Sequence, residues 1–207
     1  FNRYLAYVLA LKNGKWVNGQ SLKPVADLVG IDLGEVKHLP PAELARRIDL
    51  VIEGAARFFR QFPEANLGDQ LPGRPRSLAQ LTWHLFNVVD AFLEHERGIP
   101  LVNDAYNRLP PAGATRAEIL AYGEDVRARF AAWWATAKTR SDWSQPAKVY
   151  YGGVAVHEFL ERTTWHAGQH SRQLMWALAD KYRIEPERPF GPQMWQGLPM
   201  PEQVWDS

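Results

Sequence analysis

From residue 40 onward, the apolar residues of this chain recur every three or four positions, which is the spacing of an amphipathic α-helix. The first such segment opens at Pro40 and Pro41 and stops before Pro63, because proline is tolerated in the first turn of a helix but not in its interior. If the segment is helical, its apolar residues lie on one face; they are Leu44, Ile48, Val51, Ile52, Ala55, Phe58, Phe59 and Phe62. The segment is therefore predicted to be a long helix with one buried face.

Two further helices are predicted from the same periodicity and from their start signals. Ser77 with Gln80, and Thr115 with Glu118, have the spacing of capping boxes, in which each side chain satisfies the other residue's backbone N–H. The first of these helices is expected to end near Gly98. Their predicted inner faces are Leu78, Leu81, Leu85, Val88 and Phe92 for the first, and Ile119, Tyr122, Val126, Phe130 and Trp133 for the second.

A fourth helix is predicted over residues 154–181, and the four helices together predict an all-α fold, a four-helix bundle that occupies residues 40–207. The connections at residues 99–114 and 138–153 are long, which is typical of loops that carry function, and we expect them to rim a site. From Arg183 onward frequent prolines exclude a helix, so this Pro-rich tail is expected to wrap the bundle irregularly.

Residues 1–39 follow a different pattern and are predicted to form a small β-β-α appendage. The pair Asn13-Gly14 separates two short extended segments, which is a strong hairpin signal. Ser21 can cap a short helix that Gly30 ends. This order of elements resembles the closing third of a glutaredoxin or thioredoxin fold, although no CxxC motif is present; the competing interpretation is a hairpin and helix packed on the bundle.

The charge distribution argues against nucleic acid and membranes as partners. Lys and Arg total 24 and Asp and Glu total 23, and they are dispersed, so there is no basic stripe to neutralise phosphates. No apolar run approaches the roughly 20 residues that span a bilayer, and the first residues lack the order of a signal peptide. We therefore expect a cytoplasmic protein that acts on a small molecule.

The chain contains no cysteine, which excludes disulfides, thiolate metal ligands and a cysteine nucleophile. His, Asp and Glu remain as possible metal ligands. Any thiol chemistry would need an external thiol.

Two histidines on the fourth predicted helix could share one metal ion. His166 and His170 are four positions apart, so at about 100° per residue they lie on one face, one turn apart. His170 falls in the apolar stripe and His166 borders it, whereas His84, on the second helix, lies at the margin of its own stripe. The residues alone leave open whether His84 faces the pair, and satisfied core histidines without a metal are the competing interpretation.

A family resemblance brings His84 into the site. Leu81-Thr-Trp-His84-Leu85, the later His166-Ala-Gly-Gln-His170 and the ending Gly197 to Trp205 are similar to the DinB superfamily over residues 40–207. The resemblance implies a four-helix bundle whose three ligands, placed as His84, His166 and His170 are here, bind a divalent ion. Zinc is the first expectation, with nickel or iron as alternatives.

The resemblance also implies a function, because several members of the family are thiol-dependent S-transferases or isomerases. A related domain occurs in iron enzymes that make sulfur-containing histidine derivatives, but these have Glu two residues after the last histidine, where this chain has Arg172. We therefore expect a metal-dependent transferase that uses a low-molecular-weight thiol, or a hydrolase, and a homodimer. The competing interpretations are a non-catalytic metal-binding or stress-response protein and a dimeric structural protein without metal.

Three polar residues near the ligands are candidates for substrate binding. Arg162, one turn before His166, could anchor a substrate carboxylate, or it could be an ordinary surface charge. Asn87 and Gln173 each follow a proposed ligand by three residues, so they could orient ligands or substrate, or be exposed polar residues.

Other residues near the histidines have less specific roles. Glu158 and Glu161 are possible acceptors for an imidazole N–H, and Trp83 and Trp165 could line a cavity or pack in the core. The remaining histidines, His38, His95 and His157, are expected to be structural or on the solvent side.

Overall fold

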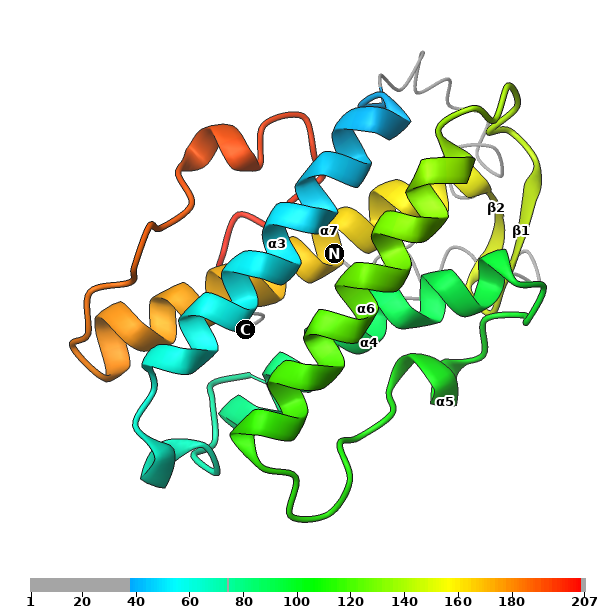
Figure 1. The fold of residues 1–207 in the computed structure, drawn as a ribbon. Coiled ribbons are helices and arrows are strands. Elements are labelled where there is room, and N and C mark those ends of the chain that lie inside the picture. The colour runs from blue at the N-terminus through cyan, green and yellow to red at the C-terminus, as the bar shows by residue number, and fades with distance from the viewer. Residues whose placement is uncertain (1–37, 74, 206–207) are drawn as a thin grey trace, which may run out of the picture.

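Four long helices form the body of the computed structural model, which describes residues 38–73 and 75–205 (Figure 1). They are α3 (Pro41–Gln61), α4 (Leu78–Glu96), α6 (Arg116–Ala137) and α7 (Val156–Trp176). All four predicted helices, and with them the all-α bundle, are confirmed. The predicted N-terminal hairpin and helix lie outside the described residues.

The helix starts follow the predicted caps. Gln80 N donates to Ser77 Oγ at 3.2 Å, and Ser77 N donates to Gln80 Oε1 at 2.9 Å. Thr115 and Glu118 make the same reciprocal pair at the start of α6. Each pair satisfies two backbone N–H groups that have no partner within the helix, so these local residues are sufficient to place the two starts.

The helices pack so that α3 and α4 each contact both α6 and α7. Large aromatic side chains fill the space between them. Their burial stabilises the bundle by about 25 cal/mol for each Å² of apolar surface removed from water. The fully buried ones are Phe58, Phe59, Phe62, Phe86, Phe92, Tyr106, Phe130 and Phe159. The pair α4 and α7 is the one that matters for the histidines, because it brings their two segments together.

The two long connections are more ordered than the sequence predicts. Residues 138–153, expected to be a loop, contribute most of an antiparallel hairpin formed by β1 (Pro146–Val149) and β2 (Gly152–Ala155). The other connection contains the short helix α5 (Asn103–Tyr106) and meets the hairpin where Leu101 N donates to Lys148 O at 2.8 Å. The loop prediction was wrong here, because β1 and β2 pair with each other within one connection. Leu101 pairs with Val149 between the two connections, a contact that the local sequence does not reveal.

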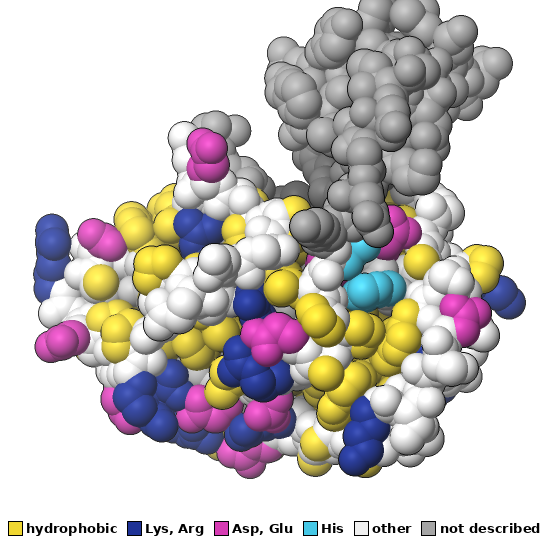
Figure 2. Space-filling view, turned by 90° about the horizontal axis from the view of Figure 1, so that it is seen from above, with side chains coloured by type: hydrophobic (Ala, Val, Ile, Leu, Met, Phe, Trp, Pro, Cys, Tyr) yellow, Lys and Arg dark blue, Asp and Glu magenta, His cyan; other side chains and the backbone are white. Residues whose placement is uncertain are grey.

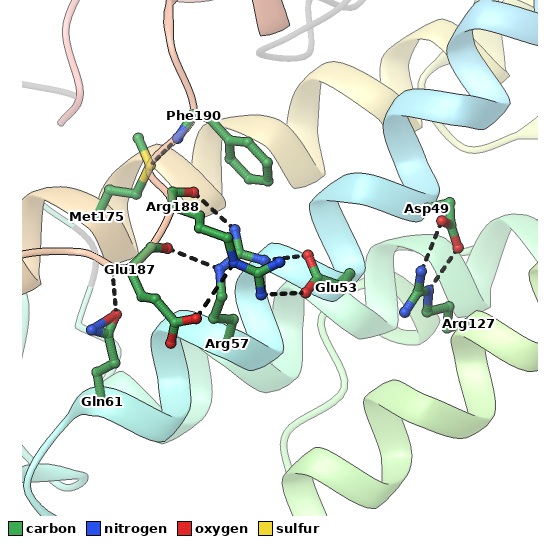
Figure 3. Close-up of polar contacts among 9 residues, drawn as sticks. All are labelled: Asp49, Glu53, Arg57, Gln61, Arg127, Met175, Glu187, Arg188 and Phe190. Atoms are coloured by element: carbon green, nitrogen blue, oxygen red, sulfur yellow. Dashed lines mark hydrogen bonds and ion pairs between the residues drawn. The ribbon is translucent and has the colours of Figure 1, made fainter.

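The C-terminal segment continues from α7 through a π-helical turn, η2 (Ala177–Lys181), and then wraps the bundle irregularly as predicted (orange to red in Figure 1). Its prolines prevent regular backbone pairing, so side chains of α3 satisfy its peptide groups. Arg57 Nε donates to Glu187 O and Arg57 Nη2 to Arg188 O, both at 2.9 Å (Figure 3). The segment also contains a short 3-10 helix, η3 (Pro192–Met194).

Replacing Arg57 with alanine is expected to destabilise the protein by about 1–3 kcal/mol, because Glu187 O and Arg188 O lose hydrogen bonds from a charged guanidinium, and such a bond contributes about 1.5–3 kcal/mol. Arg57 is only 6% exposed, so the substitution also removes the buried packing of its side chain. Urea denaturation measures the change. Arg60→Ala on the same helix is the matched control, because Arg60 pairs with Glu124 at an exposed position and such pairs contribute about 0–1 kcal/mol. Equal effects of the two substitutions would contradict the proposed anchoring role of Arg57.

Positive and negative side chains lie next to one another over the surface shown in Figure 2. Ion pairs among the described residues include Arg127 with Asp49 at 2.7 Å and Arg46 with Glu43 at 2.7 Å. Within the described residues, no helix combines the length and apolar character that crossing a membrane requires.

Candidate metal centre

The three histidines singled out from the sequence lie together between α4 and α7. One potential ligand nitrogen from each of His84, His166 and His170 lies within 4.8 Å of the other two. The ring centroids of His84 and His170 are 4.9 Å apart, and those of His166 and His170 are 4.8 Å apart. His84 is 2% exposed and His170 is 7% exposed, whereas His166 is only partly buried.

Helix geometry explains why two of the histidines lie together, and helix packing explains why the third joins them. His166 and His170 are one turn apart on α7 and face inward, as their spacing predicts. His84 reaches them because the buried face of α4, including Leu81, Leu85 and Val88, packs on α7. The question that the sequence left open is therefore decided by the contact between the two helices.

His170 is held by a side chain one turn further along α7. Its Nδ1 lies 2.7 Å from Gln173 Oε1, and Gln173 Nε2 donates to Val204 O in the C-terminal segment at 3.0 Å. Gln173 is buried, so the interpretation as an exposed polar residue is wrong. It contacts His170 directly, as expected of a residue that orients this ring.

His166 has a neighbour that the sequence analysis missed. Its Nδ1 lies 2.8 Å from the hydroxyl of Tyr106, which also accepts a hydrogen bond from Arg162 Nη1 at 3.0 Å. Burial raises the pKa of Tyr106 to about 12, although the nearby Arg162 opposes this shift, so the phenol is neutral at pH 7. Tyr106 ends α5, and the length of its connection was the available signal, since long connections are often functional.

Arg162 is buried beside the site. It is 8% exposed, and its guanidinium carbon lies 4.1 Å from the ring centroid of Tyr151 and 5.3 Å from that of Tyr106. The interpretation of Arg162 as an ordinary surface charge is therefore wrong. The contacts place a permanent positive charge among aromatic rings next to the histidines.

Asn87 binds the backbone at the end of α5. Its Nδ2 donates to the carbonyl oxygens of Ala105 at 2.9 Å and Tyr106 at 3.0 Å, and the residue is 1% exposed. It therefore ties the backbone of Tyr106 to α4, one turn after His84. The exposed interpretation is wrong for this residue too.

Replacing Tyr106 with phenylalanine is expected to weaken metal binding by about 10-fold, because His166 loses the hydroxyl that orients its ring, and loss of such partners typically costs 10–100-fold. Chelator competition measures the affinity. Tyr150→Phe removes a hydroxyl from the neighbouring ring, 6.3 Å away between centroids, and should leave the affinity unchanged. An unchanged affinity in Tyr106→Phe would show that the hydroxyl does not position His166.

The other candidates make different contacts. Glu158 accepts from Ala155 N at 2.7 Å and so caps α7, whereas Glu161 Oε2 lies 2.8 Å from His38 Nδ1. The other two histidines contact backbone groups: His157 Nε2 lies 2.8 Å from Leu39 O, and His95 Nε2 accepts from Lys148 N at 2.9 Å. Trp83 stacks on Tyr122, with the ring centroids 4.0 Å apart. Of the two tryptophans only Trp165 adjoins the group, with its ring stacked on His166 at 5.7 Å.

The donor set fits a divalent ion. Imidazole is a common ligand for zinc, nickel and iron, and partners for the second ring nitrogen are the usual support of a metal-ligating histidine. His166 and His170 both have such partners, in Tyr106 and Gln173. The group could therefore hold a metal.

The comparison with known proteins agrees with this geometry. No curated protein matches the chain. The sequence pattern of the DinB superfamily matches residues 33–174, which is more than half of the 207 residues and includes all three histidines. The ending from Gly197 to Trp205 lies outside the matched range, so its resemblance stays a prediction. With the bundle, the three histidines and the matched range in agreement, the chain belongs to the DinB superfamily.

Proposed function

We propose that this protein is a divalent-metal-dependent enzyme that transfers a small external thiol to a small electrophilic molecule, with zinc as the metal. The observation that carries the proposal is the composition of the group: three imidazoles and no carboxylate. Neutral ligands leave a divalent ion its full charge, and three protein ligands leave a coordination position for substrate, as in catalytic zinc sites. A closed structural site would use four protein ligands.

When bound, such an ion favours the thiolate form of a coordinated thiol or the hydroxide form of coordinated water. The residues of the chain supply the rest of the site. Tyr106 and Gln173 orient two of the ligand rings, and the burial of His84 and His170 limits the access of bulk water. Arg162 adds a permanent positive charge near Tyr106, which favours an anionic substrate group such as a carboxylate.

The sulfur would come from a cosubstrate, since the chain contains no cysteine. The absence of cysteine also means that no thiolate of this chain competes for the open position. Hydrolysis by coordinated water is the neighbouring possibility, because the same site would activate either nucleophile.

Metal analysis of protein purified without a histidine tag is the first test. We expect close to one equivalent of metal per chain and a rise in thermal stability on adding zinc to the metal-depleted protein, because a ligand at 100 times its Kd stabilises the native state by about 2.7 kcal/mol. Absence of stoichiometric metal would favour the structural interpretation, in which the histidines are core residues. Predicted homodimer formation can be measured on the same sample by light scattering.

A thiol panel on cobalt-substituted protein then separates an enzyme from a metal-storing or metal-sensing protein. We expect at least one low-molecular-weight thiol to change the visible cobalt spectrum and to react with an electrophile in a saturable, protein-dependent way. If no thiol perturbs the cobalt and none turns over, the transferase proposal should be dropped. Cleavage of ester or amide substrates by the same sample would point to a hydrolase instead.

A further inference from the structure

Residues 201–205 of the tail lie along α7, where the side chains of Gln169, Arg172 and Gln173 bind them. All three donate to backbone carbonyls, because this proline-containing stretch has no regular backbone partners. The accepting oxygens belong to Pro201, Glu202, Gln203 and Val204. Trp205 adds an edge-on contact with the ring of Trp176.

One of these side chains links the tail to the metal centre. Gln173 Nε2 donates to Val204 O, so the amide oxygen of Gln173 is the atom that faces His170. An amide oxygen can only accept a hydrogen bond. His170 must therefore carry its proton on Nδ1, and in neutral imidazole the lone pair is then on Nε2.

We propose that the C-terminal tail is a positioning element of the metal centre: the Val204 carbonyl, acting through Gln173, holds His170 in the Nδ1-protonated tautomer that coordinates a metal through Nε2. This inference rests on the proposed metal-dependent function, but the tautomer itself exists without metal. The tail lies beyond the range that matches the DinB superfamily, which ends at residue 174.

Arg172 has a defined part in this arrangement. Its Nη1 donates to Gln169 Oε1 at 2.9 Å and to Pro201 O at 2.7 Å, and its Nη2 donates to Glu202 O at 3.2 Å. The guanidinium of Arg172 therefore faces carbonyl oxygens of the tail. Since Arg172 and Gln169 hold the tail through contacts that do not include His170, they allow the tail to be loosened while Gln173 is left in place.

The test uses full-length protein and two measurements. Nitrogen-15 NMR of the metal-depleted protein, at a pH where His170 is neutral, reports which ring nitrogen carries the proton. Chelator competition reports the affinity for zinc. In Gln173→Leu we expect loss of the fixed tautomer and about 10–100-fold weaker zinc binding, which is the usual effect of removing a ligand's hydrogen-bond partner.

Two further variants separate the steps of the relay. An amide needs the Val204 carbonyl to turn its oxygen toward His170, whereas both oxygens of a carboxylate are acceptors. Gln173→Glu should therefore retain the tautomer and most of the affinity without the hydrogen bond to Val204 O. Arg172→Ala should loosen the tail and give a smaller loss of affinity than Gln173→Leu. Asp180→Asn, an exposed change in η2, is the matched control and should alter neither measurement. Circular dichroism checks that each variant is folded.

The outcomes distinguish this inference from the function on which it rests. If unmodified protein does not bind zinc or another divalent ion, the proposed function fails, whichever tautomer NMR reports. If unmodified protein binds zinc and Gln173→Leu retains both the tautomer and the affinity, the positioning role of Gln173 is overturned while the metal site stands. If Arg172→Ala behaves like Asp180→Asn, the contribution of the tail is overturned.

Discussion

Replacing His170 with alanine is expected to abolish stoichiometric metal binding while leaving the helical circular dichroism spectrum largely unchanged. The affinity for metal should fall by more than about 100-fold. Losses of up to about 100-fold are typical when only a hydrogen-bond partner of a ligand is removed, and this substitution removes the ligand itself. The helix should persist because alanine has the highest helix propensity and α7 is held by packing against α3 and α4. Metal analysis and chelator competition give the result.

His38→Ala is the matched control for this experiment. His38 pairs with Glu161 and is not a member of the three-histidine group, so its replacement should leave the metal content unchanged. Two results would show that the ligands are wrongly assigned: full metal binding by His170→Ala, or loss of metal in His38→Ala. His84→Ala should behave like His170→Ala, which tests separately whether the ligand from α4 belongs to the site.

Replacing Phe92 with alanine should lower the free energy of unfolding by about 3–5 kcal/mol, as usual for a fully buried phenylalanine. Phe92 on α4 is 0% exposed, and its ring packs edge-on against Trp133 of α6 at 5.0 Å and Phe159 of α7 at 5.1 Å. The substitution therefore leaves a cavity where three helices meet. A loss of this size is a large part of the 5–15 kcal/mol by which native domains are stable.

Urea denaturation of metal-depleted protein measures this change without a contribution from bound metal. Phe92→Leu keeps most of the volume and should cost clearly less than alanine. Leu109→Ala, at a position that is 64% exposed, should change the stability by no more than about 0.5 kcal/mol. A loss below about 1 kcal/mol in Phe92→Ala would contradict the packing of α4 against both neighbouring helices.

The two predictions are coupled through the same helix pair. The contact between α4 and α7 both buries Phe92 against Phe159 and brings His84 to His166 and His170. A variant that disturbs this contact should therefore weaken metal binding as well as stability. Comparing unfolding with and without zinc shows both effects in one experiment, because a ligand that binds only the native state stabilises it according to its affinity.

The parts of this protein that could be predicted from its sequence depend on residues close to one another along the chain. Capping boxes at Ser77 and Thr115 place two helix starts, because their partners are only three residues away. The inward pairing of His166 and His170 follows from their spacing on one helix. The irregular tail follows from its prolines, which exclude a long α-helix and a central strand whatever the tertiary structure is.

The tertiary structure alone decided the contacts that complete the site. Tyr106 meets His166 across 60 positions, Gln173 meets Val204 across 31, and Arg162 is buried against rings from both long connections. No periodicity or cap specifies such partners, because they depend on which helix faces lie together and on where the connections fold back. The sequence by itself determined four amphipathic helices and one pair of inward-facing histidines, His166 and His170. The packing of α4 on α7 decided that His84 joins them, because the burial of both apolar faces sets the distance between His84 and the pair.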